Sequence, residues 1–284
     1  MIEIIEHTLL DSVKLVPFLF LTYLVMEWLE HKAGSRTNTF IKKSGKFGPV
    51  VGSLLGAVPQ CGFSTAASNL YAGRVITVGT LIAIFLSTSD EMLPILISEA
   101  VSPDLILKIL GIKVVIGMVA GLLIDLLLPA KQEEHDHIHE MCEHDHCNCG
   151  QGKSIFYSAL VHTARIGLFV VIITFALNLI LHSGGEEVLA DLLSDMPVVG
   201  PLIAGLVGLI PNCAASVVLT RLYVEGMMSL GSMLAGLLAG AGAGVLVLFK
   251  TNADRKENLK ILGILYGIGV LSGIIIDFCF KLFA

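Results

Sequence analysis

Charged residues are scarce in this chain. They make up 15% of its 284 residues, while 55% are hydrophobic, and the mean hydropathy is +0.83. A chain with so little charge is too apolar for a soluble globule. Long uncharged runs recur along it, each near the roughly 20 residues that a helix needs to cross a bilayer. The composition therefore predicts an all-α polytopic membrane protein.

Several sequence signatures are missing. There is no Walker-type G-x-x-x-x-G-K-[ST] loop and no phosphorylated-aspartate motif, so we expect no coupling to ATP within the chain. The acidic start MIEIIEH has no basic region before the first apolar run, which argues against a cleaved signal peptide. The six cysteines do not form a secreted disulfide framework. The hydrophilic segments are too short for a separate catalytic domain, so we expect neither an enzyme nor a nucleic-acid partner.

One short polar stretch occurs twice. VPQCGFSTAASNLY covers residues 58–71 and IPNCAASVVLTRLY covers residues 210–223, at an offset of 152 residues. Each copy follows a glycine-rich apolar run that opens with Gly-Pro, and the same offset aligns Asp125 with Asp277. One register held over so many positions indicates an internal duplication. We therefore divide the chain into a first membrane repeat (1–129), a hydrophilic loop (130–153) and a second membrane repeat (154–284).

Each repeat is predicted to contain a helix, a proline-broken segment and two further helices. In the first repeat these cover about 12–30, 48–73, 75–97 and 105–128; in the second, about 155–181, 200–226, 227–249 and 261–280. Proline in a helix interior removes a hydrogen-bond donor and clashes with the preceding turn. Each arm of a broken segment has about 11 residues, or roughly 16 Å, which is half a bilayer. These lengths fit a re-entrant hairpin and also a single kinked span.

Loop charges favour the hairpin. The loop at 32–47 carries five basic residues and no acid, whereas the equivalent loop after residue 181 carries four acids and no Lys or Arg. Because positive loops face the cytoplasm, the two repeats should have opposite orientations, which requires an odd number of crossings in each. We therefore expect two inverted-topology repeats, each with three transmembrane helices plus a broken re-entrant helical hairpin. Both termini would lie outside, and the 130–153 loop in the cytoplasm.

The two polar turns are the first candidate site. Non-helical backbone inside a bilayer is tolerated where it is buried in protein or lines a wet cavity. The turns bring together amides, thiols and hydroxyls, on Gln60, Cys61, Ser64, Thr65, Ser68, Asn69, Asn212, Cys213, Ser216 and Thr220. The structural alternative is packing of helices through small residues and hydrogen bonds between them.

The strongest charge signal is LSTSDEMLPI at 86–95. Asp90 and Glu91 lie within an apolar segment expected to be one helix, after three hydroxyl residues, Ser87, Thr88 and Ser89. Intramembrane carboxylates are costly and usually mark an ion path or a proton relay. Together with hydroxyls and amides they suit a divalent cation such as Mn²⁺, whereas thiols would bias the site towards softer metals.

A structural alternative exists for these acids as well. They could form a pair neutralised by a basic residue, for which the candidates are Lys14, Lys108, Lys113 and Arg165. The site is asymmetric in either case, because Gly242 takes the place of Asp90 in the second repeat.

The central loop is rich in metal-binding side chains. Its ligand candidates are His135, His137, His139, Cys142, His144, His146, Cys147 and Cys149. Imidazole and thiolate bind Zn²⁺ and related metals, but the loop lacks the CxxC…CxxC spacing of a structural zinc site and has a disordered composition. We expect a loop that collects or senses metal, with Zn²⁺ as one ligand, and that transport does not need. An acidic linker is the alternative.

The two Pro-(Gln/Asn)-Cys turns, the STSDEMLPI segment and the His-rich loop together resemble a known family. This is the bacterial manganese transporter family, whose members are also described as arsenic efflux proteins and ten-span heavy-metal exporters. The resemblance covers nearly the whole chain. It implies a multi-pass protein of the bacterial inner (cytoplasmic) membrane that exports a metal or metalloid, without deciding manganese against arsenic.

We predict a secondary active transporter that exports a divalent transition-metal cation, with Mn²⁺ favoured, by alternating access between the repeats. Its partners would be the lipid bilayer, the metal substrate and a coupling H⁺ or Na⁺, with a homodimer as one option; no prosthetic group is expected. The predicted substrate ligands are Asp90, Glu91, Gln60, Cys61, Asn69, Asn212 and Cys213. Alternatives are a thiol-dependent exporter of trivalent arsenicals, a transporter of a small organic solute and a non-transporting metal sensor.

Overall fold

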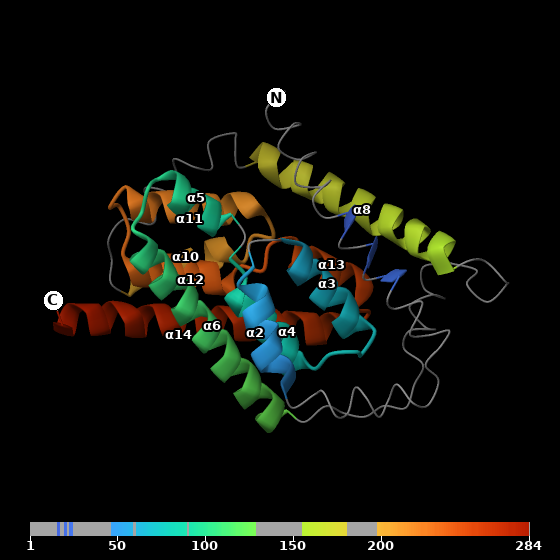
Figure 1. The fold of residues 1–284 in the computed structure, drawn as a ribbon, viewed down its shortest axis with the longest axis horizontal. Coiled ribbons are helices and arrows are strands. Elements are labelled where there is room, and N and C mark those ends of the chain that lie inside the picture. Colours follow the sequence, from blue (N-terminus) through green and yellow to red (C-terminus); the bar gives the residue numbers. More distant parts are fainter. Residues whose placement is uncertain are drawn as a thin grey trace.

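The computed structural model describes residues 16–17, 20–21, 23–24, 47–58, 61–89, 91–128, 155–180 and 198–283. The regular elements in these ranges are helices, and no strand occurs among them, which confirms the all-α class (Figure 1). Most of the predicted helix at 12–30, the residues Pro59, Gln60 and Asp90, and the whole 130–153 loop lie outside the described residues.

Helices of the two halves begin at matching places. The first half contains α2 (Gly48–Gly56), α3 (Cys61–Ala72), α4 (Val78–Ser87), α5 (Met92–Ser98) and α6 (Pro103–Leu127). The second half contains α8 (Ile155–Ile180), α10 (Val199–Gly208), α11 (Cys213–Val224), α12 (Leu230–Ala239), α13 (Ala243–Thr251) and α14 (Arg255–Phe283). The starts of α3, α4 and α6 precede those of α11, α12 and α14 by the 152 residues of the sequence offset.

One carboxylate contact recurs at that offset. Asp125, near the end of α6, accepts hydrogen bonds from the Thr77 hydroxyl at 2.7 Å and from the backbone N–H two residues later at 2.9 Å. Asp277 accepts the same two bonds from the Ser229 hydroxyl and from the backbone N–H two residues later, at 2.7 and 2.8 Å. Thr77 and Ser229 are also the N-caps of α4 and α12, so each aspartate anchors a helix start.

The predicted helices at 75–97 and 227–249 are each interrupted, so the prediction that each is one continuous helix was wrong. Residues 88–91 separate α4 from α5, and residues 240–242 separate α12 from α13. Serine, threonine and aspartate compete with the backbone for hydrogen bonds and favour caps, while glycine lowers helix propensity. In the second break Gly242 has a φ of +50°, a conformation that side-chain-bearing residues rarely adopt.

The two halves exchange arms. Helix α3 packs against α13 of the other half, and α11 packs against α5. These two pairs lie at opposite ends of the molecule, α3 with α13 on the right of Figure 1 and α5 with α11 on the left. The preceding arms pack elsewhere, α2 against α4 and α6, and α10 against α12. The arms of each broken segment are therefore held mainly by other helices.

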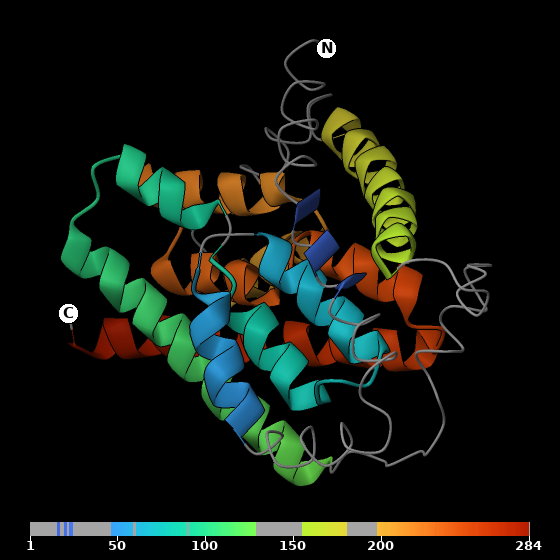
Figure 2. The same ribbon diagram turned by 45° about the vertical axis from the view of Figure 1, so that its right-hand side comes forward.

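Four helical segments in the described part of the chain are long and apolar enough to cross a membrane. They are Val78–Ser98, Pro103–Leu127, Leu230–Thr251 and Arg255–Cys279. The first and third form the interior, whereas the outer two, which contain α6 and α14, are only 28% buried (Figure 2). Their outward surfaces carry large apolar side chains, as expected for helices that face lipid.

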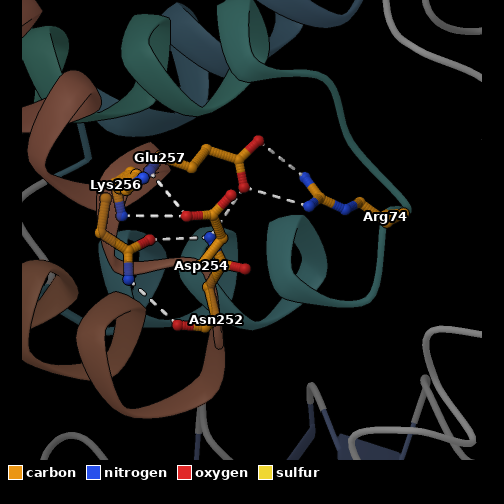
Figure 3. Close-up of polar contacts among 6 residues, drawn as sticks. Arg74, Asn252, Asp254, Lys256 and Glu257 are labelled. Carbon is orange, nitrogen blue, oxygen red and sulfur yellow. Dashed lines mark hydrogen bonds and ion pairs between the residues drawn. The ribbon is translucent and has the colours of Figure 1, made fainter.

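An ion pair marks one end of the bundle. Arg74, in the turn after α3, donates to both carboxylate oxygens of Glu257 at the start of α14, at 3.1 and 3.0 Å (Figure 3). The chain enters α4 just after Arg74, but it leaves α13 just before Glu257. The equivalent segments α4–α5 and α12–α13 therefore run in opposite directions relative to this end.

Candidate functional site

A small cavity lies between the two halves, at the breaks in the interior helices. Its volume is about 20 Å³, slightly more than the 10–15 Å³ that one water needs. The first half contributes the residues of its α4–α5 break, and α10, α11 and α12 contribute their ends. The described lining residues are Thr88, Ser89, Gly208, Asn212, Ala215, Ser216, Leu219, Gly236, Leu237, Gly240 and Gly242.

Several helix ends meet at this cavity. The C-terminal ends of α4, α10 and α12 reach it, and so do the N-terminal ends of α11 and α13. The last carbonyls of a helix lack intrahelical partners and carry partial negative charge, and the first N–H groups carry partial positive charge. The cavity wall can therefore offer oxygen ligands to a cation and N–H donors to an anionic group.

The hydroxyls in the lining donate to backbone carbonyls. Thr88 and Ser216 each donate to a carbonyl three or four residues earlier, at 2.7 Å in both cases. Ser89 donates to the Ala57 carbonyl at 2.8 Å and so ties the α4–α5 break to the end of α2. Because each proton is used in this way, the lone pairs of the three oxygens remain available as acceptors or metal ligands.

Asn212 anchors the second polar turn. It is the N-cap of α11, where its side-chain oxygen accepts from the Ala214 N–H at 3.4 Å, and it is 5% exposed. Cys213 follows as the first residue of the helix, half-buried and without a disulfide. The structure thus places one amide and one thiol of the predicted site at or beside the cavity.

The polar residues of α3 are buried but are not among the described residues that line the cavity. Ser64, Thr65, Ser68 and Asn69 have no exposed surface. The Ser68 hydroxyl donates to the Ser64 carbonyl at 2.9 Å and to a backbone carbonyl of α13 at 2.7 Å. Ser68 therefore joins α3 to the opposite half through a hydrogen bond between helices, the kind of contact that the structural alternative predicts.

Asn69 has one unsatisfied amide group. Its oxygen accepts from the Tyr23 hydroxyl at 3.1 Å, but its Nδ2 finds no hydrogen-bond partner among the described residues. Ser87 and Thr220, two other predicted supporting residues, donate to carbonyls of their own helices. Neither is among the described lining residues.

The charged part of the predicted site is described only in part. Glu91 is half-buried at the start of α5, while Asp90, Gln60 and the Cys61 side chain lie outside the described residues, as does the entire His-rich loop. Among the residues that are described, no three His, Cys, Asp or Glu side chains gather into a group able to hold a metal ion.

Comparison with known families identifies the chain. The profile of the ArsP_2 family, described as "Putative, 10TM heavy-metal exporter", matches residues 1–188 and again residues 164–281. The chain belongs to this family. The resemblance seen in the sequence is thereby confirmed, and with it a multi-span membrane protein of a heavy-metal exporter family. Comparison with curated proteins and with solved structures finds no match.

One charged residue of this ArsP_2 protein stands out in the interior. Lys113 of α6 has no exposed surface, and its ammonium donates to the Leu237 carbonyl near the end of α12, at 2.7 Å. Leu237 belongs to the cavity wall. The sequence indicated Lys113 as one of four possible partners for the acids, but it did not predict that the lysine reaches the other half.

The glycine-rich wall of the cavity was indicated in the sequence by Gly242 opposite Asp90, but its glycines were not among the predicted site residues. Gly236, Gly240 and Gly242 contribute no side chain, so the wall that they form consists largely of backbone. The run LAGAGAGV at 238–245 carried the signal, since repeated glycines in an apolar segment indicate a helix break or a close backbone approach.

Proposed function

We propose that the chain is a secondary active transporter that exports a divalent transition-metal cation, with Mn²⁺ favoured, from the cavity between its halves. The observation that carries this proposal is the meeting of helix C-termini and hydroxyls from both halves at one small cavity. Carbonyl and hydroxyl oxygens are the ligands that Mn²⁺ accepts readily. Broken helices whose ends meet at midplane are also how many secondary transporters build their ion sites.

The charge of the site would come from the α4–α5 break. Asp90 is the residue after Ser89, which lines the cavity, and Glu91 comes directly after Asp90. Both carboxylates are proposed to bind the cation, and to take up protons from water when the cation leaves and release them when it binds, since an intramembrane acid is otherwise a costly choice. Asn212 and Cys213, with Gln60, Cys61 and Asn69 of the first half, are proposed to complete or shape the coordination.

Alternating access is proposed to use two inverted-topology repeats. Supporting this, α4–α5 and α12–α13 run in opposite directions relative to the Arg74–Glu257 end, and matching carboxylate contacts recur at the same offset. In the proposed topology each broken segment is a re-entrant hairpin, α2–α3 entering from the cytoplasm and α10–α11 from outside. The Arg74 end and the His-rich loop would then face the cytoplasm, and both termini the outside, in an inner membrane.

Export of trivalent arsenicals is the second candidate. It is favoured by the position of Cys213, which starts α11 beside the cavity, and by the equivalent start of α3 at Cys61. Thiolates bind soft metals and metalloids, whereas Mn²⁺ prefers oxygen. In this case the two cysteines would bind the substrate, and Asp90 would only relay protons.

Flux into proteoliposomes separates the candidates. The purified protein would be given Mn²⁺, Zn²⁺, Fe²⁺, Co²⁺ or arsenite under an imposed pH gradient. Saturable Mn²⁺ movement that is lost in a folded Asp90→Asn variant, and only weakened in a Cys61→Ser/Cys213→Ser variant, is expected. Full Mn²⁺ flux in the Asp90→Asn variant would contradict the assignment of Asp90 as a ligand of the transported cation. Arsenite flux that needs the cysteines and tolerates Asp90→Asn would support the arsenical candidate instead.

A further inference from the structure

Lys113 lies level with both helix breaks. It belongs to a buried face of α6 that also includes Ile109 and Gly117. Gly117 packs against Ser87 at the end of α4, and Ile109 belongs to the apolar cluster that contains Met92 of α5. Lys113 is between them on the helix, so it stands beside the α4–α5 break. From there its side chain reaches the end of α12.

The matching position of the second half carries no charge. At the offset of 152 residues the second half has Leu265, which is 1% exposed. An apolar side chain therefore fills the equivalent place in α14 without difficulty. Burying an ammonium in an apolar bundle is unfavourable unless strong acceptors compensate it. Leucine fills the matching place of the duplicated copy, so the charge of Lys113 distinguishes the first half from the second at this level of the bundle.

The acceptor that Lys113 uses is one that a transported cation would also use. Leu237 lies in the last turn of α12, where carbonyls lack the N–H donor that a following helical turn would supply. A cation at a helix C-terminus is stabilised by those carbonyls and by the helix dipole. Leu237 also lines the cavity. The ammonium is thus bound to the same carbonyl end that faces the proposed substrate.

We propose that Lys113 is a tethered competitor of the transported cation. This inference rests on the proposed function. When the cavity holds no substrate, the ammonium is hydrogen-bonded to the carbonyl end of α12. A metal ion that enters is repelled by the ammonium charge and has to displace the ammonium from the carbonyl. The positive charge therefore weakens metal binding and speeds release. Lys113 thus acts on metal binding through its charge and is not a ligand of the metal.

The proposal makes binding and turnover change in opposite directions. Lys113→Gln keeps a donor for the Leu237 carbonyl but removes the charge, and Lys113→Met removes both. Both variants are expected to bind Mn²⁺ about 5- to 150-fold more tightly, the usual range of coupling between two ligands, and to transport it more slowly. Lys113→Arg keeps the charge and is expected to bind Mn²⁺ with an affinity close to that of the wild type.

The experiment is calorimetric titration of the full-length protein in detergent with MnCl₂, followed by flux measurements on the same variants. Leu265→Met is the matched control, because it changes the equivalent position without charge and should alter neither measurement. A folded Lys113→Gln variant that binds Mn²⁺ as the wild type does, or more weakly, would overturn the proposal. A wild-type protein that binds neither Mn²⁺ nor Zn²⁺, Fe²⁺ or Co²⁺ would instead remove the proposed function, and this inference with it.

Discussion

Arg74 and Glu257 join the two halves through a paired hydrogen bond, 3.1 and 3.0 Å long, at the end where α3 meets α14. The guanidinium also lies 5.2 Å from the centre of the Tyr71 ring. Asn252 donates to the same carboxylate at 3.0 Å (Figure 3). Burial lowers the pKa of Arg74, but the Glu257 carboxylate outweighs it, so the pKa is raised and the charge is secure.

Arg74 makes its ion pair with Glu257 from a left-handed backbone conformation that is strained for an arginine. Its φ is +56°, and the residue at the equivalent position of the second half is Gly226, with a φ of +74°. Arg74→Ala is expected to lower the free energy of unfolding by about 1 kcal/mol or less, because the side chain is 40% exposed and surface ion pairs are weak. Thermal or denaturant unfolding in detergent would measure it.

Arg74→Gly is the control for the ion-pair prediction. It loses the same ion pair but relieves the left-handed backbone, which is worth roughly 1 kcal/mol. The glycine variant should therefore be more stable than the alanine variant. If the two are equally stable, the backbone at Arg74 is not strained.

Asp125 and Asp277 should be equally important for stability. Asp125→Asn and Asp277→Asn each put an amide in place of a carboxylate that accepts one hydroxyl and one backbone N–H. Charge-assisted hydrogen bonds of this kind contribute about 1.5–3 kcal/mol. Each variant is expected to lose stability in that range, measured by unfolding in detergent. A loss confined to one of the two would show that the matching contacts are not equivalent.

Removing one oxygen from the cavity should weaken substrate binding without harming the fold. Thr88→Val deletes a lining hydroxyl and keeps the shape of the side chain. Loss of one ligand is expected to raise the KM for metal about tenfold, equivalent to roughly 1.4 kcal/mol. The matched control is Thr65→Val, since Thr65 is also buried and donates to its own helix but is not among the described lining residues. Equal KM changes in both variants would remove Thr88 from the site.

Gly242 should tolerate no side chain. Its φ of +50° makes Gly242→Ala unfavourable by roughly 1–2 kcal/mol, and the added methyl enters the break that lines the cavity. We expect lower stability and slower flux. Gly267→Ala is the control, because a Cβ there meets nothing within 4 Å and alanine favours a helix. If Gly242→Ala behaves like Gly267→Ala, the break does not depend on glycine.

Transport should survive deletion of the His-rich loop. Removing residues 133–149 takes away the loop's His and Cys ligands and leaves both membrane halves intact. Flux in proteoliposomes is expected to stay within about twofold of the wild type. The number of Zn²⁺ ions bound per purified protein should decrease, because the His and Cys ligands of the loop are gone. Loss of flux with the fold preserved would make the loop part of the transport path.

The helical class and the positions of the proline breaks could be predicted from the sequence. Both follow from local chemistry, as with Pro211, which precedes the start of α11 at Cys213. The offset between the halves was also readable, and the Asp125 and Asp277 contacts recur at it. These features depend on residues close in sequence or on identities that can be aligned.

The interruptions at 88–91 and 240–242 were missed. Each is a short stretch of weak helix formers inside an apolar run long enough to span a membrane, and the length of that run favoured one continuous helix. The contacts between halves could not be predicted, since they join distant residues. Ser68 and Gly244 are 176 residues apart, and Lys113 and Leu237 are 124 apart. The cavity lining depends on these contacts, so only Thr88, Ser89, Asn212 and Ser216 of the predicted residues could be placed there.

The exchange of arms between the halves has a consequence for synthesis. Helix α3 emerges early from the ribosome, but its packing partner α13 follows more than 170 residues later. The buried Ser68 of α3 therefore lacks its acceptor on α13, the Gly244 carbonyl, until nearly the whole chain has been made. Neither half is then a folding unit by itself. Assembly of this protein is completed only when its last two helices arrive.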